Sequence, residues 1–204
     1  NFEYYSEDPL LAGKLAAGFI RGAEGEGVGT SLKHFAVNNQ ETLRMSVSAE
    51  VDERALHELY LRPFEIAVKE GAPSTVMCSY NRINGVYASE NRMLLTRILR
   101  EQWGFDGLVM SDWGAVYRRP AGVAAGLDLE MPSSGGVTDR EIVRAVRAGR
   151  LDEAALDALC ARVLRLALAH APQRKKAYPA PVHNVAAVRR MLDRHHALAV
   201  RAAR

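Results

Sequence analysis

Short apolar runs alternate along the chain with stretches in which apolar residues recur at helical spacing. Four runs have strand character, at residues 30–37, 74–79, 108–111 and 127–131. The helical periodicity predicts helices over residues 9–21, 52–70, 91–103, 121–125, 138–148, 152–170 and 185–204. Pro63 is expected to bend or interrupt the second helix.

The order of these elements predicts an α/β fold. Strands that are short and continuously apolar are typical of a parallel sheet covered on both faces. Four strand–helix units correspond to half of a (β/α)8 barrel, and a doubly wound open sheet fits the same order. Residues 1–170 are predicted to form this partial barrel. Residues 171–204 are predicted to be a proline-containing basic linker and a helix.

Local signals define several helix starts. Asp8 followed by Pro9 is an N-cap pattern, and Asp152 is expected to cap another helix. The segment from Thr138 to Glu141 has the pattern of a capping box. Residues 38–48 and 80–91 are predicted to be loops.

Charge and composition exclude several classes of protein. The chain is 48% hydrophobic with a net charge of +3, and 14 of its 27 Lys/Arg but only 5 of its 24 Asp/Glu follow residue 139. These late arginines are spaced along helical patterns, which favours solvated helix faces over nucleic-acid binding. The sequence contains no run of about 18 apolar residues, so it predicts no membrane-spanning helix. The glycines at 22–29 match neither a P-loop nor a dinucleotide fingerprint.

Neither the cysteines nor the histidines predict a metal site. Cys78 and Cys160 lie in apolar patterns without metal-like spacing, so both are expected to be buried free thiols, as in a reducing compartment. The histidines also lack ligand spacing. The sequence therefore predicts no metal and no organic cofactor.

Polar residues with chemical potential follow the predicted strands at their carboxyl ends, where barrel enzymes keep their active sites. Asp112 comes directly after an apolar run, where a carboxylate is costly unless it is paired or functional. Trp113 beside it suits stacking on a sugar ring. The structural alternative for Asp112 is a helix N-cap at a strand–helix turn.

Other residues near these ends are weaker candidates. Lys33 and His34 are adjacent, but twist at a strand end brings both to the mouth, where they can donate to hydroxyls. Arg44 and Tyr80 lie in loops beside them. The predicted acidic partners of these cations are Glu41 and Glu130.

A long ordered series of motifs resembles family 3 glycoside hydrolases. It begins with Asn1-Phe2-Glu3, Ser6 to Pro9 and Lys33-His34-Phe35. It continues with Met77 to Asn81, Asn84-Gly85, Trp103 to Phe105, Gly107 to Trp113, Gly126 to Asp128 and Met131-Pro132. The similarity spans about residues 1–170, and its order and spacing make it far more specific than any single motif.

The resemblance implies a (β/α)8-like barrel followed by an α/β sandwich, with the chain a fragment containing the C-terminal half of the barrel. It implies double displacement with Asp112 as nucleophile, and Trp113 beside it. Lys33, His34, Arg44, Tyr80 and Met77 match positions that hold or surround the sugar. Lys33 and Arg44 are expected to favour the charged form of Asp112. The family's acid/base glutamate normally comes from the second domain, so no residue here receives that role.

Several functions remain open from the sequence. The continuation from Ala36 to Glu41 resembles the β-glucosidase and β-xylosidase branch rather than the β-N-acetylglucosaminidases. A terminal β-D-glucose in a β-glucoside or oligosaccharide is the favoured substrate, with xylose close behind. The alternatives of other classes are a non-catalytic carbohydrate-binding half-barrel and a Schiff-base aldolase built on Lys33.

Overall fold

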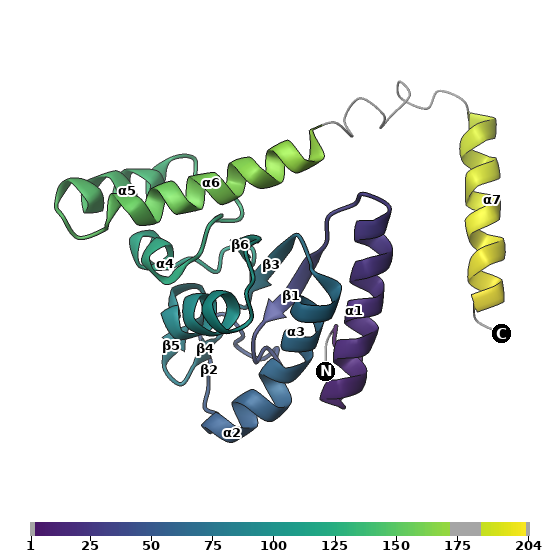
Figure 1. Ribbon diagram of the computed structural model, residues 1–204, viewed down its shortest axis with the longest axis horizontal. Helices are drawn as coiled ribbons and strands as arrows, with labels where there is room; N and C mark the ends of the chain where they lie inside the picture. The colour runs from purple at the N-terminus through teal and green to yellow at the C-terminus, as the bar shows by residue number, and fades with distance from the viewer. Residues whose placement is uncertain (1–2, 172–184, 203–204) are drawn as a thin grey trace. The chain divides into compact units, whose positions relative to one another are not determined.

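The computed structural model describes residues 3–171 and 185–202 (Figure 1). The chain divides into two compact units, Asn1–Leu168 and Ala169–Arg204. In the second unit, the helix α7 (Val185–Ala202) occupies the described part and follows the predicted helix closely. The predicted linker at 171–184 lies almost wholly outside the described residues.

A three-stranded parallel sheet forms the centre of the first unit. Its strands are β1 (Ser31–Phe35), β3 (Thr75–Cys78) and β6 (Leu108–Ser111), in the order β1-β3-β6. Cys78 is in register with Phe35 on one side and with Ser111 on the other. The carboxyl ends of all three strands therefore lie at one edge, as the sequence predicts.

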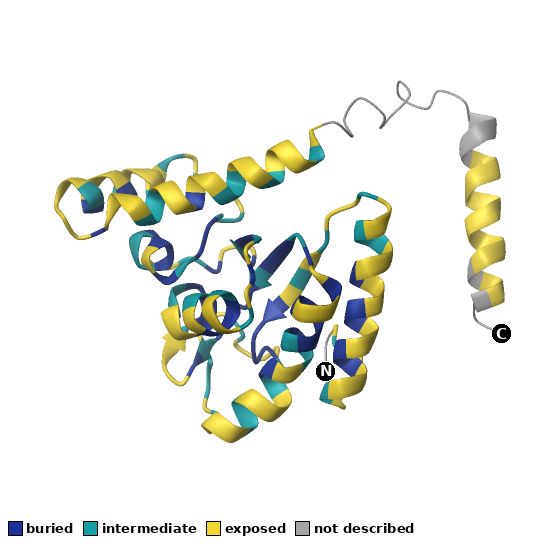
Figure 2. Cartoon of the chain, in the orientation of Figure 1, coloured by how far each residue is buried: buried dark blue, intermediate teal, exposed yellow. Residues whose placement is uncertain are grey.

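Helices cover one face of this sheet and bury it (Figures 1 and 2). The main core joins strand residues such as Val76 and Val109 to helix residues such as Leu61, Leu95 and Leu99. Most of these side chains are almost inaccessible to solvent. The elements that bring this face together are α1 (Pro9–Gly25), α2 (Glu53–Ala55), η1 (Leu56–Leu61), α3 (Arg62–Ile66), η2 (Ala67–Gly71) and η4 (Met93–Gln102).

Two of the predicted helix features are confirmed. The Asp8 carboxylate accepts the amides of Leu10 and Leu11 and caps α1, which extends past the predicted end to Gly25. The helical stretch 53–71 changes from π-helical to α-helical hydrogen bonding at Arg62–Pro63, because proline cannot donate to the preceding turn. Gly13 lets α1 approach α3 closely, since an added Cβ would lie 2.8 Å from Ile66.

A second, small sheet forms within segments predicted to be loops. It contains β2 (Ser48–Ala49), β4 (Arg82–Ile83) and β5 (Val86–Tyr87), and the short helix η3 (Ala88–Glu90) follows. Two-residue strands carry too little periodicity to be read from sequence. The Asn84-Gly85 turn that joins β4 to β5 was nevertheless visible as turn chemistry.

Three further helices pack around a satellite core. They are α4 (Arg119–Ala125), α5 (Val137–Arg147) and α6 (Glu153–His170), with Val123, Ile142, Leu151 and Leu159 among the buried residues. Asp152 accepts the amide of Ala154, as expected of a cap. The predicted capping box is wrong: Thr138 lies inside α5, and its amide is accepted by the Ser134 hydroxyl instead.

Two other predictions need correction. Residues 127–131 form no strand among the described elements, only a single parallel bridge between Leu129 and Met110. The Asp128 carboxylate accepts the amide of Val109 at 2.8 Å, so a side chain takes the place of a backbone partner. Cys78 is buried as expected, but Cys160 is exposed, because most of α6 faces solvent and Leu159 is its one buried residue.

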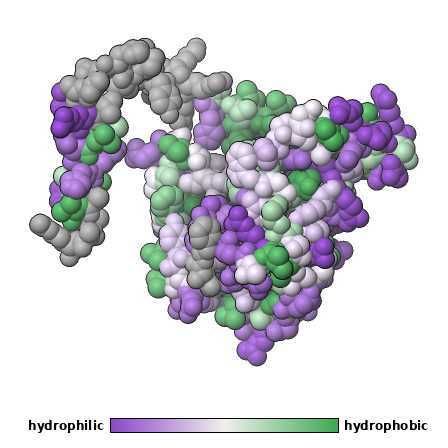
Figure 3. All heavy atoms as spheres, turned by 180° about the vertical axis from the view of Figure 1, so that it is seen from behind, coloured by the Kyte–Doolittle hydropathy of each residue, from purple (hydrophilic) through white to green (hydrophobic). Residues whose placement is uncertain are grey.

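The surface of the first unit mixes polar and apolar patches (Figure 3). Across residues 3–171 and 185–202, no helix is long and apolar enough to cross a membrane. Within the same residues, no cluster of His, Cys, Asp and Glu has the composition of a metal site.

Candidate active site

Asp112 follows the last residue of β6 and is 5% exposed. Its amide donates to the Cys78 carbonyl at 3.2 Å, which fixes it to the end of β3. Its Oδ1 accepts the amide of Trp113 at 2.7 Å. The helix-cap alternative is wrong, because the next helix, α4, begins only at Arg119 and its cap position is Arg118. The Asp112 carboxylate is therefore held at a strand end without serving as a helix cap.

His34 is a close titratable neighbour of this carboxylate. Its Nε2 lies 3.4 Å from Asp112 Oδ2, and the residue is 8% exposed. Burial lowers the pKa of His34 below the usual 6.5, and this outweighs the charge of Asp112, which raises it. At neutral pH the imidazole is therefore uncharged and can exchange hydrogen bonds with a hydroxylated ligand.

Lys33 and His34 reach the same group, Glu3. Lys33 Nζ lies 2.8 Å from Glu3 Oε2, and His34 Nδ1 lies 3.7 Å from the same oxygen. The register of β1 is irregular between Leu32 and Phe35, so adjacent side chains no longer alternate strictly between faces. The hydrogen bond from Lys33 holds the pKa of Glu3 below its usual value, against the effect of partial burial.

Tyr80 and Arg44 form a second group beside Asp112. Tyr80 is buried beside Asp112. Burial raises the pKa of Tyr80, and the charge of Asp112 raises it further, so the phenol stays protonated. The Arg44 guanidinium lies 4.8 Å from the Tyr80 ring centroid and 2.8 Å from Glu41.

The remaining two candidates are Met77 and Trp113. Met77 is half-buried on β3, in register with Met110. Trp113 is 58% exposed, so a large part of its indole surface is open to solvent. The structure thus places His34 3.4 Å from Asp112, and the charge of Asp112 acts on Tyr80. It links Lys33 to them through Glu3, and Arg44 through Tyr80.

The expected acidic partners are partly wrong. Glu41 pairs with Arg44 as predicted, but Glu130 contacts Arg119 and Thr138 instead of Lys33 or Arg44. Glu3 was missed, because nothing in its local sequence indicates that it meets β1. Lys33 and Arg44 pair with Glu3 and Glu41 rather than Asp112. Among the described residues, no lysine or arginine forms an ion pair with Asp112.

The environment of Lys33 does not fit Schiff-base chemistry. A lysine nucleophile of that kind needs a desolvated amine, commonly beside another cation. The Lys33 side chain is 42% exposed and is paired with a carboxylate. The arrangement instead offers one buried carboxylate beside hydrogen-bond donors and an exposed aromatic ring, which is suited to a polyhydroxylated ligand.

Comparisons with known proteins agree on one family. The model of the glycosyl hydrolase family 3 N-terminal domain matches residues 1–166. Thermostable beta-glucosidase B of Acetivibrio thermocellus is 55% identical over 166 residues, which cover 81% of this chain and 22% of that protein. An exo-alpha-(1->6)-L-arabinopyranosidase of Bifidobacterium longum is 56% identical over 165 residues, with the same coverage.

Solved structures show the same likeness. A GH3 beta-glucosidase of Bifidobacterium adolescentis has a TM-score of 0.83 and 51% identity, over 89% of this chain and 27% of that one. Beta-glucosidase 3B of Thermotoga neapolitana, in complex with alpha-D-glucose, has a TM-score of 0.80 and 46% identity, over 82% and 24%. The fold is therefore of the TIM-barrel α/β type, and the doubly wound alternative is wrong. The chain spans about a fifth of the length of the curated relatives it matches.

Proposed function

This chain belongs to glycosyl hydrolase family 3, and from that premise we propose that it supplies the nucleophile of a retaining glycosidase acting on a terminal β-linked sugar. The observation that carries the proposal is the Asp112 carboxylate. It is buried at the end of β6, caps no helix, and contacts an uncharged histidine and a phenol rather than a cation.

The reaction proceeds by double displacement. An Asp112 oxygen attacks the anomeric carbon, the bond from that carbon to the leaving oxygen breaks, and a glycosyl ester forms. Water then attacks the same carbon and releases Asp112 as a carboxylate. The first step needs a proton for the leaving oxygen, from a carboxyl group about 5–5.5 Å from the nucleophile. We assign that role to no residue of this chain.

The other side chains hold the sugar and the nucleophile. Tyr80 donates to Asp112 and fixes the direction of its carboxylate. His34 and Lys33 donate to sugar hydroxyls, with Glu3 as the acceptor between them. Trp113 offers an exposed indole face to the sugar's C–H groups, while Arg44 supports Tyr80 and Met77 lines the pocket.

Glucose is the sugar we favour, because relatives in several organisms are named beta-glucosidases. The arabinopyranosidase relative, at 56% identity, supports a pentopyranoside as the second candidate, which includes xylose. These sugars lack the exocyclic CH₂OH of glucose, so their rings place fewer demands on the pocket.

A mechanism-based label tests the proposal on this chain. A 2-deoxy-2-fluoro-β-glucoside with a dinitrophenolate leaving group needs no proton donor, so an acid/base residue is not required for trapping. Mass spectrometry of peptides is expected to place the label on Asp112, with no label in Asp112→Asn and normal labelling in Asp139→Asn. The matching xyloside and arabinopyranoside reagents compare the sugars. A label on another residue, or none from all three reagents on the folded chain, contradicts the proposal.

A further inference from the structure

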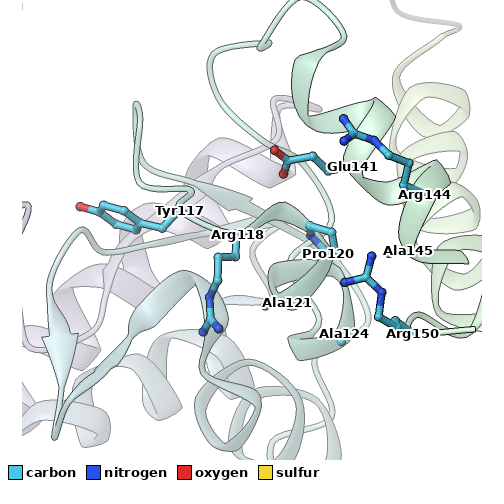
Figure 4. Close-up of a pocket in the computed structure, with 9 residues that line it drawn as sticks. All are labelled: Tyr117, Arg118, Pro120, Ala121, Ala124, Glu141, Arg144, Ala145 and Arg150. Carbon is cyan, nitrogen blue, oxygen red and sulfur yellow. The ribbon is translucent and has the colours of Figure 1, made fainter. Parts of the chain in front are cut away.

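A second hollow lies between α4 and α5, apart from the residues around Asp112. Its volume is about 520 Å³, within the usual range for a small-molecule site. The apolar lining consists of Pro120, Ala121, Ala124 and Ala145, and Tyr117 lies at the edge with its ring directed away from the arginines (Figure 4). Arg118, Arg144, Arg150 and Glu141 supply the charged groups.

The three arginines differ in the hydrogen-bond and ion-pair partners that they have within the chain. Arg118 is held by Glu90, which accepts from both its backbone amide and its guanidinium. Arg144 donates Nε to the carbonyl of Arg140. Within residues 3–171 and 185–202, neither Arg144 nor Arg150 forms an ion pair, although both line the hollow (Figure 4). Two guanidinium groups are therefore available to an anion, with planar donor geometry that matches phosphate or carboxylate.

Glu141 restricts the ligand further. Its half-buried carboxylate lines the same hollow and forms no ion pair within the described part of the chain, so it needs hydrogen-bond donors from whatever binds. A ligand that satisfies both sides has an anionic group for the arginines, hydroxyl donors for Glu141, and a C–H face for the alanines and the proline.

We propose that this hollow binds a monosaccharide that carries an anionic group, a phosphate or a carboxylate. The site is separate from the one at Asp112 and does not depend on the proposed function. Arg144 and Arg150 bind the anionic group. Glu141 accepts from ring hydroxyls, and Pro120 with the three alanines provides the apolar surface for the C–H face of the ring.

Titration calorimetry on the full chain at low salt tests the proposal with four probes: glucose 6-phosphate, glucuronate, inorganic phosphate and glucose. Saturable binding is expected for at least one of the two anionic sugars, with inorganic phosphate about tenfold weaker and no comparable binding of glucose at this site. The comparison of glucose 6-phosphate with glucuronate identifies which anionic group the site prefers. Inorganic phosphate binding as tightly as the anionic sugars would overturn the sugar part of the proposal.

The variants separate this hollow from general surface charge. Arg144→Ala with Arg150→Ala is expected to weaken the anionic sugar about tenfold or more, since charge-assisted hydrogen bonds are lost. Arg147→Ala with Arg140→Ala removes the same amount of charge from α5, at positions that do not line the hollow, and is expected to change affinity less than about twofold. The Arg144→Lys, Arg150→Lys variant keeps both charges. It is the control for loss of binding through misfolding in the alanine pair. Equal losses in the two alanine pairs, or no saturable binding of either anionic sugar, would overturn the proposal.

Discussion

Asp112 and Asp128 are two buried carboxylates beside the same strand, β6, with opposite surroundings. The Asp128 side chain is inaccessible to solvent and is bound by Arg100 at 2.7 Å, Arg162 at 2.8 Å and the amide of Val109 at 2.8 Å. Asp112 has one close backbone donor, a protonated phenol that its charge influences, and an uncharged imidazole 3.4 Å away.

The difference separates a structural carboxylate from one that is available to react. Both are buried, and an unpaired carboxylate is costly in such a place. Asp128 meets that cost with two guanidinium groups, one of them from α6, and ties α6 and η4 to the sheet. Asp112 has no such partner among the described residues, so its charge remains available to a ligand. The comparison therefore supports Asp112 as the nucleophile and assigns Asp128 to the framework.

The largest expected effect is on stability at Asp128. Asp128→Ala leaves two half-buried guanidinium groups and the buried Val109 amide without their acceptor, and should cost about 3–5 kcal/mol of unfolding free energy. Urea denaturation measures it, with the exposed Asp139→Ala as control, expected within about 0.5 kcal/mol of the parent chain. A loss of similar size in both variants would contradict the framework role of Asp128.

The pH dependence of the unfolding free energy tests the protonation state of His34, the neighbour of Asp112. The folded pKa of His34 lies below its unfolded value, so the unfolded chain binds the proton more readily. The stability contributed by uncharged His34 is thus complete above about pH 6.5 and is lost as the pH falls through 6.5 toward the folded pKa.

Variants isolate this effect. His34→Gln should flatten the dependence of unfolding free energy on pH between about 7 and 5, and the exposed His57→Gln should leave it unchanged. An unchanged slope in His34→Gln would show that the imidazole is not held uncharged by burial.

A smaller effect on stability is expected at Asp112 itself. Asp112→Asn keeps the shape and an acceptor for the Trp113 amide, so the unfolding free energy should change by less than about 1 kcal/mol. The same substitution removes the charge that raises the pKa of His34, which should fall further in NMR titrations. A loss as large as that of Asp128→Ala would mean that Asp112 is a framework residue too.

The smallest expected effect is on the reactivity of the two thiols. Cys78 is fully buried in register with the strand end of β6, and burial raises its pKa to about 12, whereas Cys160 is exposed on α6. A thiol reagent should modify Cys160 alone in the parent chain and in Asp112→Asn. Asp128→Ala should add slow reaction at Cys78, because it loosens β6. Rapid reaction of Cys78 in the parent chain would contradict the tight packing of this sheet.

The sequence by itself determined the elements with strong periodicity. The strand at 108–111 and the helix at 152–170 needed only local hydrophobic pattern and a cap, because their spacing is set by the backbone. The motif series also placed the chain in its family and singled out Asp112. The sequence did not predict the short strands β2, β4 and β5. They contain two residues each, which is too few for a periodic pattern, and they form only through hydrogen bonds with one another.

Only the tertiary structure decided which charges meet. Glu3 reaches Lys33 and His34 across about 30 residues of chain, Arg162 reaches Asp128 across 34, and the two arginines left unpaired between α4 and α5 depend on how those helices pack. Such contacts depend on the approach of distant segments, and that approach is set by burial of the core rather than by local sequence. The same physics explains why two similar-looking aspartates received different surroundings: the fold supplied guanidinium groups to one of them and left the other without them.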